Sequence, residues 1–423
     1  MKENKRAVWS WAFYDWGNSA YSTTVMAGFF PLFFKEYWAD PHNPNQSTFY
    51  LGMANSIASI VVASLAPLLG SIADQGSAKK KFLTLFAFLG VIMTGGLWMV
   101  SQGNWQMAVV FYVMATIGFA SGNVFYDSLL PGLASEKRVD VVSSLGFGLG
   151  YLGGGLLFLV NVFMYLKPEI FGIPDGATAI KLSFLSVAVW WAVFTIPLIL
   201  FVPEPKNYDS VNIKNAIQMG WMQLFQTFKE IRNMKVVGTF LLAYFFYIDG
   251  VDTIIKMAVD YGMSLNFSGE SLIIALLIVQ FVAFPAALIY GRLGAKVGAK
   301  KAIMIGIIAY SVITFLGYFI TKAWHFYVLA ILIGLFQGGI QALSRSLYTR
   351  IIPAEKSAEF FGFYNMLGKY AAIIGPTLMG TISLVTGSAR LGILSILLLF
   401  ILGAFLLNKV DLDEGKRLAA EGL

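Results

Sequence analysis

The chain has 423 residues, of which 57% are hydrophobic and only 13% are charged. Because soluble globular proteins carry about 25% charged residues, this composition excludes an ordinary water-soluble domain. The chain has no cysteine, which excludes disulfides and thiol chemistry. It also lacks the HExxH, GxSxG and GxxxxGKS/T motifs of hydrolases and ATP-using proteins. We therefore expect no enzyme activity, no cofactor and no metal site.

Apolar segments long enough to span a bilayer recur along the whole chain, whose mean hydropathy is +0.71. A helix of about 20 apolar residues crosses the hydrocarbon core, and twelve segments meet this length. They lie at about 8–38, 49–73, 82–101, 105–130, 141–166, 179–202, 236–262, 270–291, 302–321, 324–350, 358–386 and 389–408. The sequence therefore predicts an all-α integral membrane protein with twelve transmembrane helices in a lipid bilayer.

Lysine and arginine are unevenly divided between the two ends of these segments. If the N-terminus is cytoplasmic, 22 of the 30 fall on the cytoplasmic side, 5 on the other side and 3 within spans. Such a bias orients helical membrane proteins, with the positive loops inside. We therefore expect a multi-pass protein of the cell (inner) membrane with both termini cytoplasmic. The same bias accounts for the net charge of +7, so we expect no nucleic-acid partner.

Polar residues share one face of the first span and one face of the fourth. Asp15, Asn18 and Ser22 lie together on the first, and Asn123 and Asp127 lie four residues apart on the fourth. A charge in the bilayer costs about 2.5–3.5 kcal/mol even on insertion scales, so such residues are candidates for binding a solute, an ion or a proton. Four tyrosines close to polar faces are candidates for lining a cavity: Tyr14, Tyr21, Tyr126 and Tyr247.

The seventh span carries the densest charge, since Asp249, Asp252, Lys256 and Asp260 fall within about 80° of one another on a helix. On one interpretation an aspartate binds a proton or an amine. On the other, the acids pair permanently with bases and only hold helices together. Asp252 and Lys256 have the i,i+4 spacing of a local ion pair, which leaves Asp249 as the transport candidate. Asp260 is expected near the outer end.

Two cationic candidates follow in the tenth and eleventh spans. Arg345 shares a face with Gln337 and Gln341, and its guanidinium suits a substrate carboxylate or phosphate. An ion pair with Asp127 is the alternative for this arginine. Lys369 has no acid three or four residues away, so it must pair with another helix, for example through Asp15, or lose its proton.

The second half of the chain repeats features of the first. The loop that begins at Gly70 and contains Asp74 is echoed 221 residues later by a Gly-rich basic loop that begins at Gly291. The sequence therefore predicts a six-helix bundle at 1–202, a cytoplasmic linker at 203–235, and a second bundle with a short tail at 236–423. Apolar residues at spacings of three and four predict an amphipathic helix in the linker, namely Ile213, Ile217, Trp221, Leu224, Phe228 and Ile231.

Twelve spans, internal termini and paired Gly-rich basic loops resemble the major facilitator superfamily. More specific strings resemble its vacuole-effluxer-like (autophagy-related effluxer) branch in a prokaryotic version: WAFYDWGNSAYSTTV at 11–25, FYDSLLP at 125–131, SSLGFGLGYLGGG at 143–155, QALSRSLYTRIIP at 341–353 and FFGFYNMLGKYAAIIGP at 360–376. The resemblance implies that the first, fourth, seventh and tenth helices line one cavity. It also implies that Asp74 docks at the start of the eleventh helix, around 358–360, as a cytoplasmic gate. Fungal members are associated with amino-acid release from the vacuole.

These observations lead to one functional hypothesis and two alternatives. We expect a monomeric secondary transporter with alternating access, coupled to a proton or another cation, that moves a small polar or zwitterionic molecule such as an amino acid or peptide. The solute amine would lie near Asp249 or Asp15 and its carboxylate near Arg345. The alternatives are an exporter of amphiphiles, such as drugs or lysolipids, and a non-transporting scaffold or sensor with the same fold.

Overall fold

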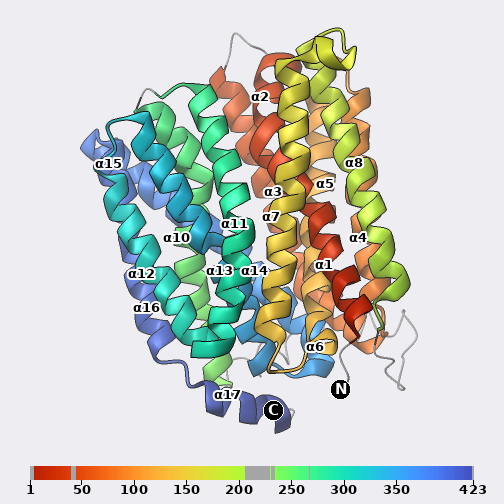
Figure 1. Ribbon diagram of the computed structural model, residues 1–423, viewed down its shortest axis with the longest axis vertical. Coiled ribbons are helices and arrows are strands. Elements are labelled where there is room, and N and C mark those ends of the chain that lie inside the picture. The colour runs from red at the N-terminus through yellow and green to blue at the C-terminus, as the bar shows by residue number, and fades with distance from the viewer. Residues whose placement is uncertain (1–3, 40–43, 205–228, 230–233, 266, 422–423) are drawn as a thin grey trace.

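The computed structural model describes residues 4–39, 44–204, 229, 234–265 and 267–421, and these are helical apart from short connections. Ten of the described helices are long and apolar enough to cross a membrane. The other two predicted spans, the first and the eleventh, are helical as well. The amphipathic helix predicted in the linker lies outside the described residues. In Figure 1 both chain ends lie at the lower end of the molecule, which we call the termini face.

The N-terminal half, residues 4–204, begins with a segment that alternates α and π turns where the sequence predicts one regular helix. Its pieces are α1 (Lys5–Ala20), η1 (Tyr21–Phe29), α2 (Phe30–Phe33) and η2 (Phe34–Trp38). The remaining elements are α3 (Pro44–Gln75), α4 (Lys79–Gly96), η3 (Leu97–Met99), α5 (Trp105–Ser128), α6 (Leu130–Leu133), α7 (Val139–Leu166), η4 (Pro168–Phe171) and α8 (Gly176–Phe201). π turns inside helices are frequently found at functional sites, and here they lie in the outer part of the first span.

The C-terminal half, residues 234–421, repeats this arrangement with longer regular helices. Its elements are α10 (Lys235–Ser264), α11 (Gly269–Val297), α12 (Ala299–Gly317), α13 (Ala323–Ile351), η5 (Ala354–Lys356), α14 (Ser357–Thr386), α15 (Ala389–Ser395), α16 (Leu397–Asn408) and α17 (Leu412–Glu421). Local sequence sets several ends. The Ser268 hydroxyl accepts a hydrogen bond from the Ser271 N–H at the start of α11. Gly387 ends α14 at a φ of 67° that favours glycine.

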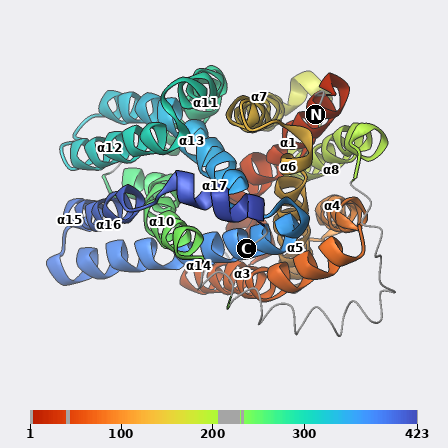
Figure 2. The same cartoon turned by 90° about the horizontal axis from the view of Figure 1, so that it is seen from below.

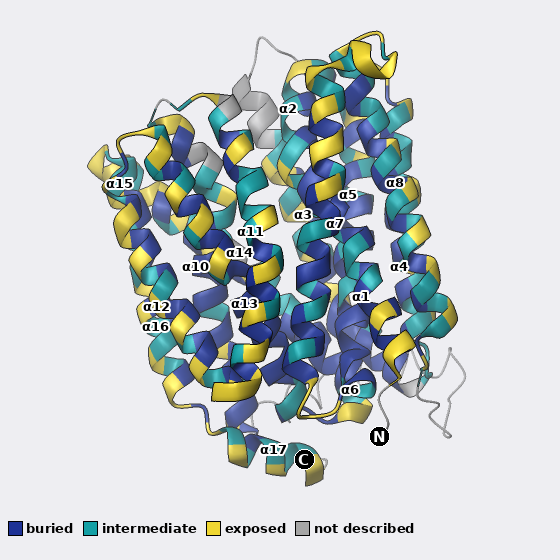
Figure 3. Cartoon of the chain, in the orientation of Figure 1, coloured by how far each residue is buried: buried dark blue, intermediate teal, exposed yellow. Residues whose placement is uncertain are grey.

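Each half has its own apolar core, since the buried residues form one main cluster at 7–202 and another at 234–410. The N-terminal cluster also includes Ala358 of α14. Side chains on the outside of the bundle are apolar as well, for example the exposed Leu200, Ile289 and Ile401. Figure 3 shows this distribution, with yellow residues facing outward and dark blue residues between helices. This pattern fits a lipid environment.

The most extensive contacts between the halves are made by two helix pairs: α3 lies against α14, and α7 lies against α11. Figure 2, seen from the termini face, shows both pairs side by side and α17 running beneath the bundle. Small residues allow the close approach. A Cβ at Gly362 of α14 would lie 2.6 Å from the Pro67 Cα of α3, and one at Gly148 of α7 would lie 3.3 Å from the Phe284 carbonyl oxygen of α11.

Candidate functional site

A buried arginine links the two halves near the termini face. Arg345 Nη1 of α13 lies 2.8 Å from Asp127 Oδ1 of α5. Its Nε donates to the Ser143 hydroxyl at 2.9 Å, and Nη2 donates to the Ser143 carbonyl at 2.8 Å. The guanidinium also lies over the rings of Trp11 and Phe147, 4.9 and 4.3 Å from the centroids. Of the two alternatives for Arg345, the structure therefore contains the ion pair with Asp127.

A second ion pair, which sequence reasoning missed, lies closer to the termini face. Arg350 of α13 binds Asp140 of α7 through both guanidinium ends, with Nη1–Oδ1 at 2.6 Å and Nη2–Oδ2 at 2.9 Å. The Ser346 hydroxyl donates to the same carboxylate at 2.5 Å. Asp140 is only 1% exposed. The usable signal was a basic residue at the end of the tenth span facing an acid at the start of the fifth.

Asp74 lies at the N-terminus of α14, where the family resemblance expects it. Its carboxylate accepts hydrogen bonds from the Ala358 N–H at 3.2 Å and the Glu359 N–H at 2.9 Å. Lys79 Nζ lies 2.8 Å from Asp74 Oδ1 and donates to the Ser357 hydroxyl at 2.7 Å. A helix N-terminus favours an anion through its free N–H groups and its dipole, so this contact clamps α3 to α14.

The polar contacts between the halves end at Tyr151, near the middle of α7. Its hydroxyl donates to Gln341 Oε1 of α13 at 2.8 Å. Within the described part of the chain, no hydrogen bond or ion pair joins the halves beyond this bond on the side away from the termini. The halves are therefore fastened together at the termini face in this structure.

Asp15 lies beside this last bond, on α1, and is partly exposed. It accepts hydrogen bonds from the Ser19 hydroxyl at 3.0 Å and from the Tyr126 hydroxyl at 3.4 Å. Gly150 of α7 makes room for it, since a Cβ there would lie 2.9 Å from Asp15 Oδ1. Asp15 forms no ion pair with any described residue, so the proposed pair with Lys369 is not present.

The other polar candidates of the first and fourth spans bind each other. Asn18 Nδ2 donates to Asn123 Oδ1 at 2.6 Å, and Asn18 is only 1% exposed. This bond ties α1 to α5 within the N-terminal half. Both residues therefore make an internal contact of that half, and only Asn123 is partly exposed.

The tyrosines predicted to line a cavity are instead buried inside the halves. Tyr14, Tyr21 and Tyr247 are each 0% exposed. The Tyr21 hydroxyl bonds the Thr116 hydroxyl at 2.8 Å, and the Tyr247 hydroxyl bonds the Ser344 hydroxyl at 2.6 Å. Tyr126 is also buried, but its hydroxyl reaches Asp15. In this conformation the rings of Tyr14, Tyr21 and Tyr247 therefore fill helix contacts within one half.

Asp249 lies at the middle of α10 and is 0% exposed. Its Oδ1 accepts hydrogen bonds from the Gly375 N–H of α14 at 3.0 Å and from the Thr253 hydroxyl at 3.3 Å. Its Oδ2 is buried and has no hydrogen-bond partner among the described residues. A carboxyl buried in this way is costly to ionise without further partners.

The remaining charges of α10 and α14 stay apart. Asp252 interacts electrostatically with Lys256 and Lys369, but neither lysine forms an ion pair or hydrogen bond with a residue that the structure describes. The predicted local pair of Asp252 and Lys256 is therefore wrong for this conformation. Lys256 is exposed, while Asp252 and Lys369 are partly exposed. The side chain of Asp260 lies outside the described part of the structure.

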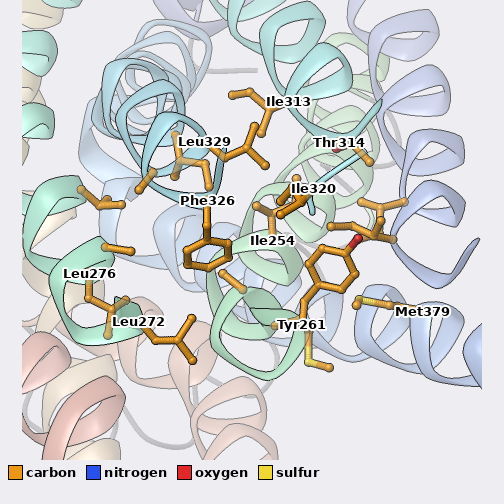
Figure 4. Close-up of a pocket in the computed structure, with 18 residues that line it drawn as sticks. Ile254, Tyr261, Leu272, Leu276, Ile313, Thr314, Ile320, Phe326, Leu329 and Met379 are labelled. Carbon is orange, nitrogen blue, oxygen red and sulfur yellow. The ribbon is translucent and has the colours of Figure 1, made fainter. Parts of the chain in front are cut away.

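An apolar cavity lies elsewhere in the C-terminal half, on the side away from the termini. Figure 4 shows its lining, which includes Ile254, Tyr261, Leu272 and Phe326. Its volume is about 50 Å³, whereas ligand pockets typically have about 300–1,000 Å³. The Tyr261 hydroxyl is already bonded to the Gly317 carbonyl at 2.8 Å. This cavity is a packing gap and has no polar group free to orient a solute.

Comparison with known proteins identifies the family. The profile described as "Vacuole effluxer Atg22 like" matches residues 44–420. The chain belongs to this family. The effluxer-like chain is 40% identical to the uncharacterized MFS-type transporter YxiO of Bacillus subtilis (strain 168), over 96% of this chain and 95% of that one. It is 28% identical to Autophagy-related protein 22 of Saccharomyces cerevisiae (strain ATCC 204508 / S288c), over 86% and 77% of the two chains.

Solved structures show the fold of this effluxer-like protein. The proton:xylose symporter XylE superposes with a TM-score of 0.73 at 15% identity, over 98% of this chain and 97% of that one. The human organic anion transporter MFSD10 superposes with a TM-score of 0.70 at 13% identity, over 95% and 99%. The effluxer-like protein is thus a multi-pass membrane transporter with the major facilitator fold, as the sequence predicted.

Tyr151 is the residue at the contact between the halves that sequence reasoning missed. It interacts electrostatically with both Asp15 and Asp252, one from each half. The signal was present in the string SSLGFGLGYLGGG, where a single tyrosine interrupts a run of glycines. Glycines on the same helix face let the neighbouring helices approach, so the one large polar side chain between them has to lie at the interface.

Proposed function

We propose that this protein is a proton-coupled secondary transporter that moves a small zwitterionic solute by alternating access. The observation that carries the proposal is Asp249, a carboxyl buried at the middle of α10 with one oxygen unpartnered. Asp249 binds a proton in one part of the cycle and releases it when water reaches it. Its neighbours Gly375 and Thr253 hold Oδ1 through hydrogen bonds, which leaves Oδ2 for the proton.

The unpaired charges around Asp249 argue against a scaffold or sensor. Asp252, Lys256 and Lys369 lie in spans, and none forms an ion pair with a described residue. Since charges inside a membrane are costly and normally paired, a protein without a charged or polar cargo has no reason to retain three unpaired ones. A polar cargo supplies the missing partners.

Three contacts support alternating access, because they form a gate that has to open in the other half of the cycle. Asp74 holds the start of α14, Asp140 binds Arg350, and Asp127 binds Arg345. All three lie toward the termini face. From the distribution of basic residues we place this face in the cytoplasm, and we place the monomer in the cell membrane. The structure then represents the state that is closed to the cytoplasm.

Transport by the purified protein in liposomes tests the proton-binding role. Radiolabelled amino acids are offered with and without a pH gradient to wild type, Asp249→Asn and Asp413→Asn, the last an exposed acid of α17 as matched control. We expect the gradient to drive uptake in wild type and in the control but not in Asp249→Asn. That variant should still exchange solute across the membrane at equal pH. Gradient-driven uptake by Asp249→Asn at the wild-type rate would contradict the proposal.

A further inference from the structure

The cationic residues in the spans of this protein fall into two groups, those that donate hydrogen bonds to described residues and those that donate none. Arg345 is engaged at every nitrogen, because Nε, Nη1 and Nη2 each donate a hydrogen bond to Ser143 or Asp127. Lys256 and Lys369 donate none to the described residues. Both lysines are accessible, one exposed and the other partly exposed. The cations with free donors therefore lie on α10 and α14, and Arg345 has no nitrogen left over for a solute.

An acid without an ion pair to any described residue lies on the other half. Asp15 of α1 is partly exposed and forms no ion pair with a described residue. Tyr151 is within electrostatic reach of both Asp15 and Asp252, and its neighbour Gly150 lies against the Asp15 carboxylate, since a Cβ there would lie 2.9 Å from Asp15 Oδ1. The bond from Tyr151 to Gln341 is the last polar contact between the halves. This bond lies between the gate contacts at the termini face and the charged residues of α1, α10 and α14.

We propose that Lys256 and Lys369 bind the carboxylate of the solute while Asp15 binds its ammonium group. This assignment rests on the proposed transport of zwitterions and specifies which side chains bind the two charged groups of the solute. It replaces the expectation that Arg345 takes the carboxylate. The charges agree: two lysines and Asp252 together carry one positive charge, which one carboxylate balances, and Asp15 carries one negative charge, which one ammonium balances.

Asp252 has a positioning role in this arrangement. It lies within electrostatic reach of both lysines, which repel each other and would otherwise lose protons or move apart. Because Asp252 does not lock either lysine into a direct ion pair, both ammonium groups remain available. A solute carboxylate completes the cluster instead of displacing an existing bond.

Thermal shift and equilibrium binding on the purified full chain test the assignment. The probes are the twenty standard L-amino acids, their carboxamides, which lack the negative charge, and the matching acids that lack the amine. The variants are Lys256→Gln, Lys369→Gln, the charge-retaining Lys369→Arg, and Asp15→Asn. Lys322→Gln is the matched control, since Lys322 is exposed in the connection before α13.

We expect at least one amino acid to stabilise wild type and the control, and its carboxamide to bind about tenfold more weakly, which is ~1.4 kcal/mol at 25 °C. Lys369→Gln should weaken amino-acid binding about tenfold and leave carboxamide binding unchanged, and Lys369→Arg should restore most of the loss. Asp15→Asn should weaken binding of the amino acid but not of the acid that lacks the amine.

Equal binding of acid and carboxamide by wild type, or wild-type affinity in folded Lys256→Gln and Lys369→Gln, would overturn the assignment. If amino acids still move in a pH gradient and Asp249→Asn still stops them, the carboxylate site alone has failed. If no amino acid stabilises or crosses with wild type, the proposed function has failed with it.

Discussion

Replacing Asp140 with asparagine should open the gate at the termini face. Asp140 is 1% exposed and binds both ends of the Arg350 guanidinium, at 2.6 and 2.9 Å. Removing one partner of a buried ion pair costs about 3–5 kcal/mol. Asparagine keeps one acceptor oxygen, and Arg350 keeps its bond to the Glu136 carbonyl at 3.0 Å. We therefore expect Asp140→Asn to cost less than this range, about 2 kcal/mol.

This loss of free energy destabilises only the closed conformation, because the pair joins α7 of one half to α13 of the other. When the gate opens, the pair is broken in wild type as well. The ratio of closed to open molecules should therefore fall by about 30-fold, since 1.4 kcal/mol is a factor of ten. The variant should remain folded, as each half keeps its own apolar core.

Labelling of one engineered cysteine measures the shift, because the natural chain contains none. Ser144 of α7 is buried at 1% exposure, its hydroxyl has no described hydrogen-bond partner, and it packs against Gly291 of α11. Ser144→Cys should thus react with a maleimide only when α7 and α11 separate. We expect up to about 30-fold faster labelling in the Asp140→Asn background. Labelling of the exposed Lys296→Cys should not change. Equal rates at Ser144→Cys with and without Asp140→Asn would refute the reasoning.

Two further substitutions test the same gate with the same cysteine. Gly70→Ala should speed labelling and slow transport, because a Cβ at Gly70 would overlap the backbone at the start of α14, whereas Gly52→Ala of α3 should change neither, since nothing lies within 4 Å of a Cβ there. Unchanged labelling in Gly70→Ala would contradict the close packing. Lys416→Gln should speed labelling only slightly, because its ion pair with Glu136 is largely exposed and contributes at most ~1 kcal/mol. The hydrogen bond from Lys416 lowers the pKa of Glu136 below its ordinary value, so this stabilisation is present above that value and lost as pH falls. The difference between wild type and Lys416→Gln should vanish in acid, and a difference that persists there would exclude the ion pair as its source.

The helices were predictable from sequence because each one meets the length and hydropathy that a membrane requires, independently of its neighbours. Length and hydropathy place the twelve segments, and the ends agree with local signals such as Ser268 at the start of α11 and Gly387 after α14. The π turns from Tyr21 to Phe29 were not predictable, since they depend on how the first span packs against other helices. The contact of Asp74 with α14 was accessible only through family resemblance.

Partner choice among the charges was the part that sequence could not decide. Spacing allowed Asp252 to pair with Lys256, but i,i+4 spacing brings two groups close without forcing contact, and the structure leaves them apart. Arg345 had two equal interpretations until the fold placed Asp127 and Ser143 against it. The ion pair of Arg350 with Asp140 was not predicted because both residues lie at helix ends, where membrane orientation alone explains a basic residue.

The proposed roles of the charged residues in this transporter also give a physical reason why solute movement and proton movement are coupled. On the proposed assignment, Asp15 and Asp252 carry two negative charges, Lys256 and Lys369 carry two positive ones, and a zwitterion adds none. The Arg345 and Asp127 pair is neutral as well. The net charge of the solute site is therefore the same loaded or empty, and among these described residues Asp249 decides whether the moving structure carries an unbalanced buried charge. Asp249 is already 0% exposed in this structure, so without a proton it is a buried charge that costs several kcal/mol. A bound proton removes the cost, so solute movement and proton movement become linked through a residue that need not touch the solute.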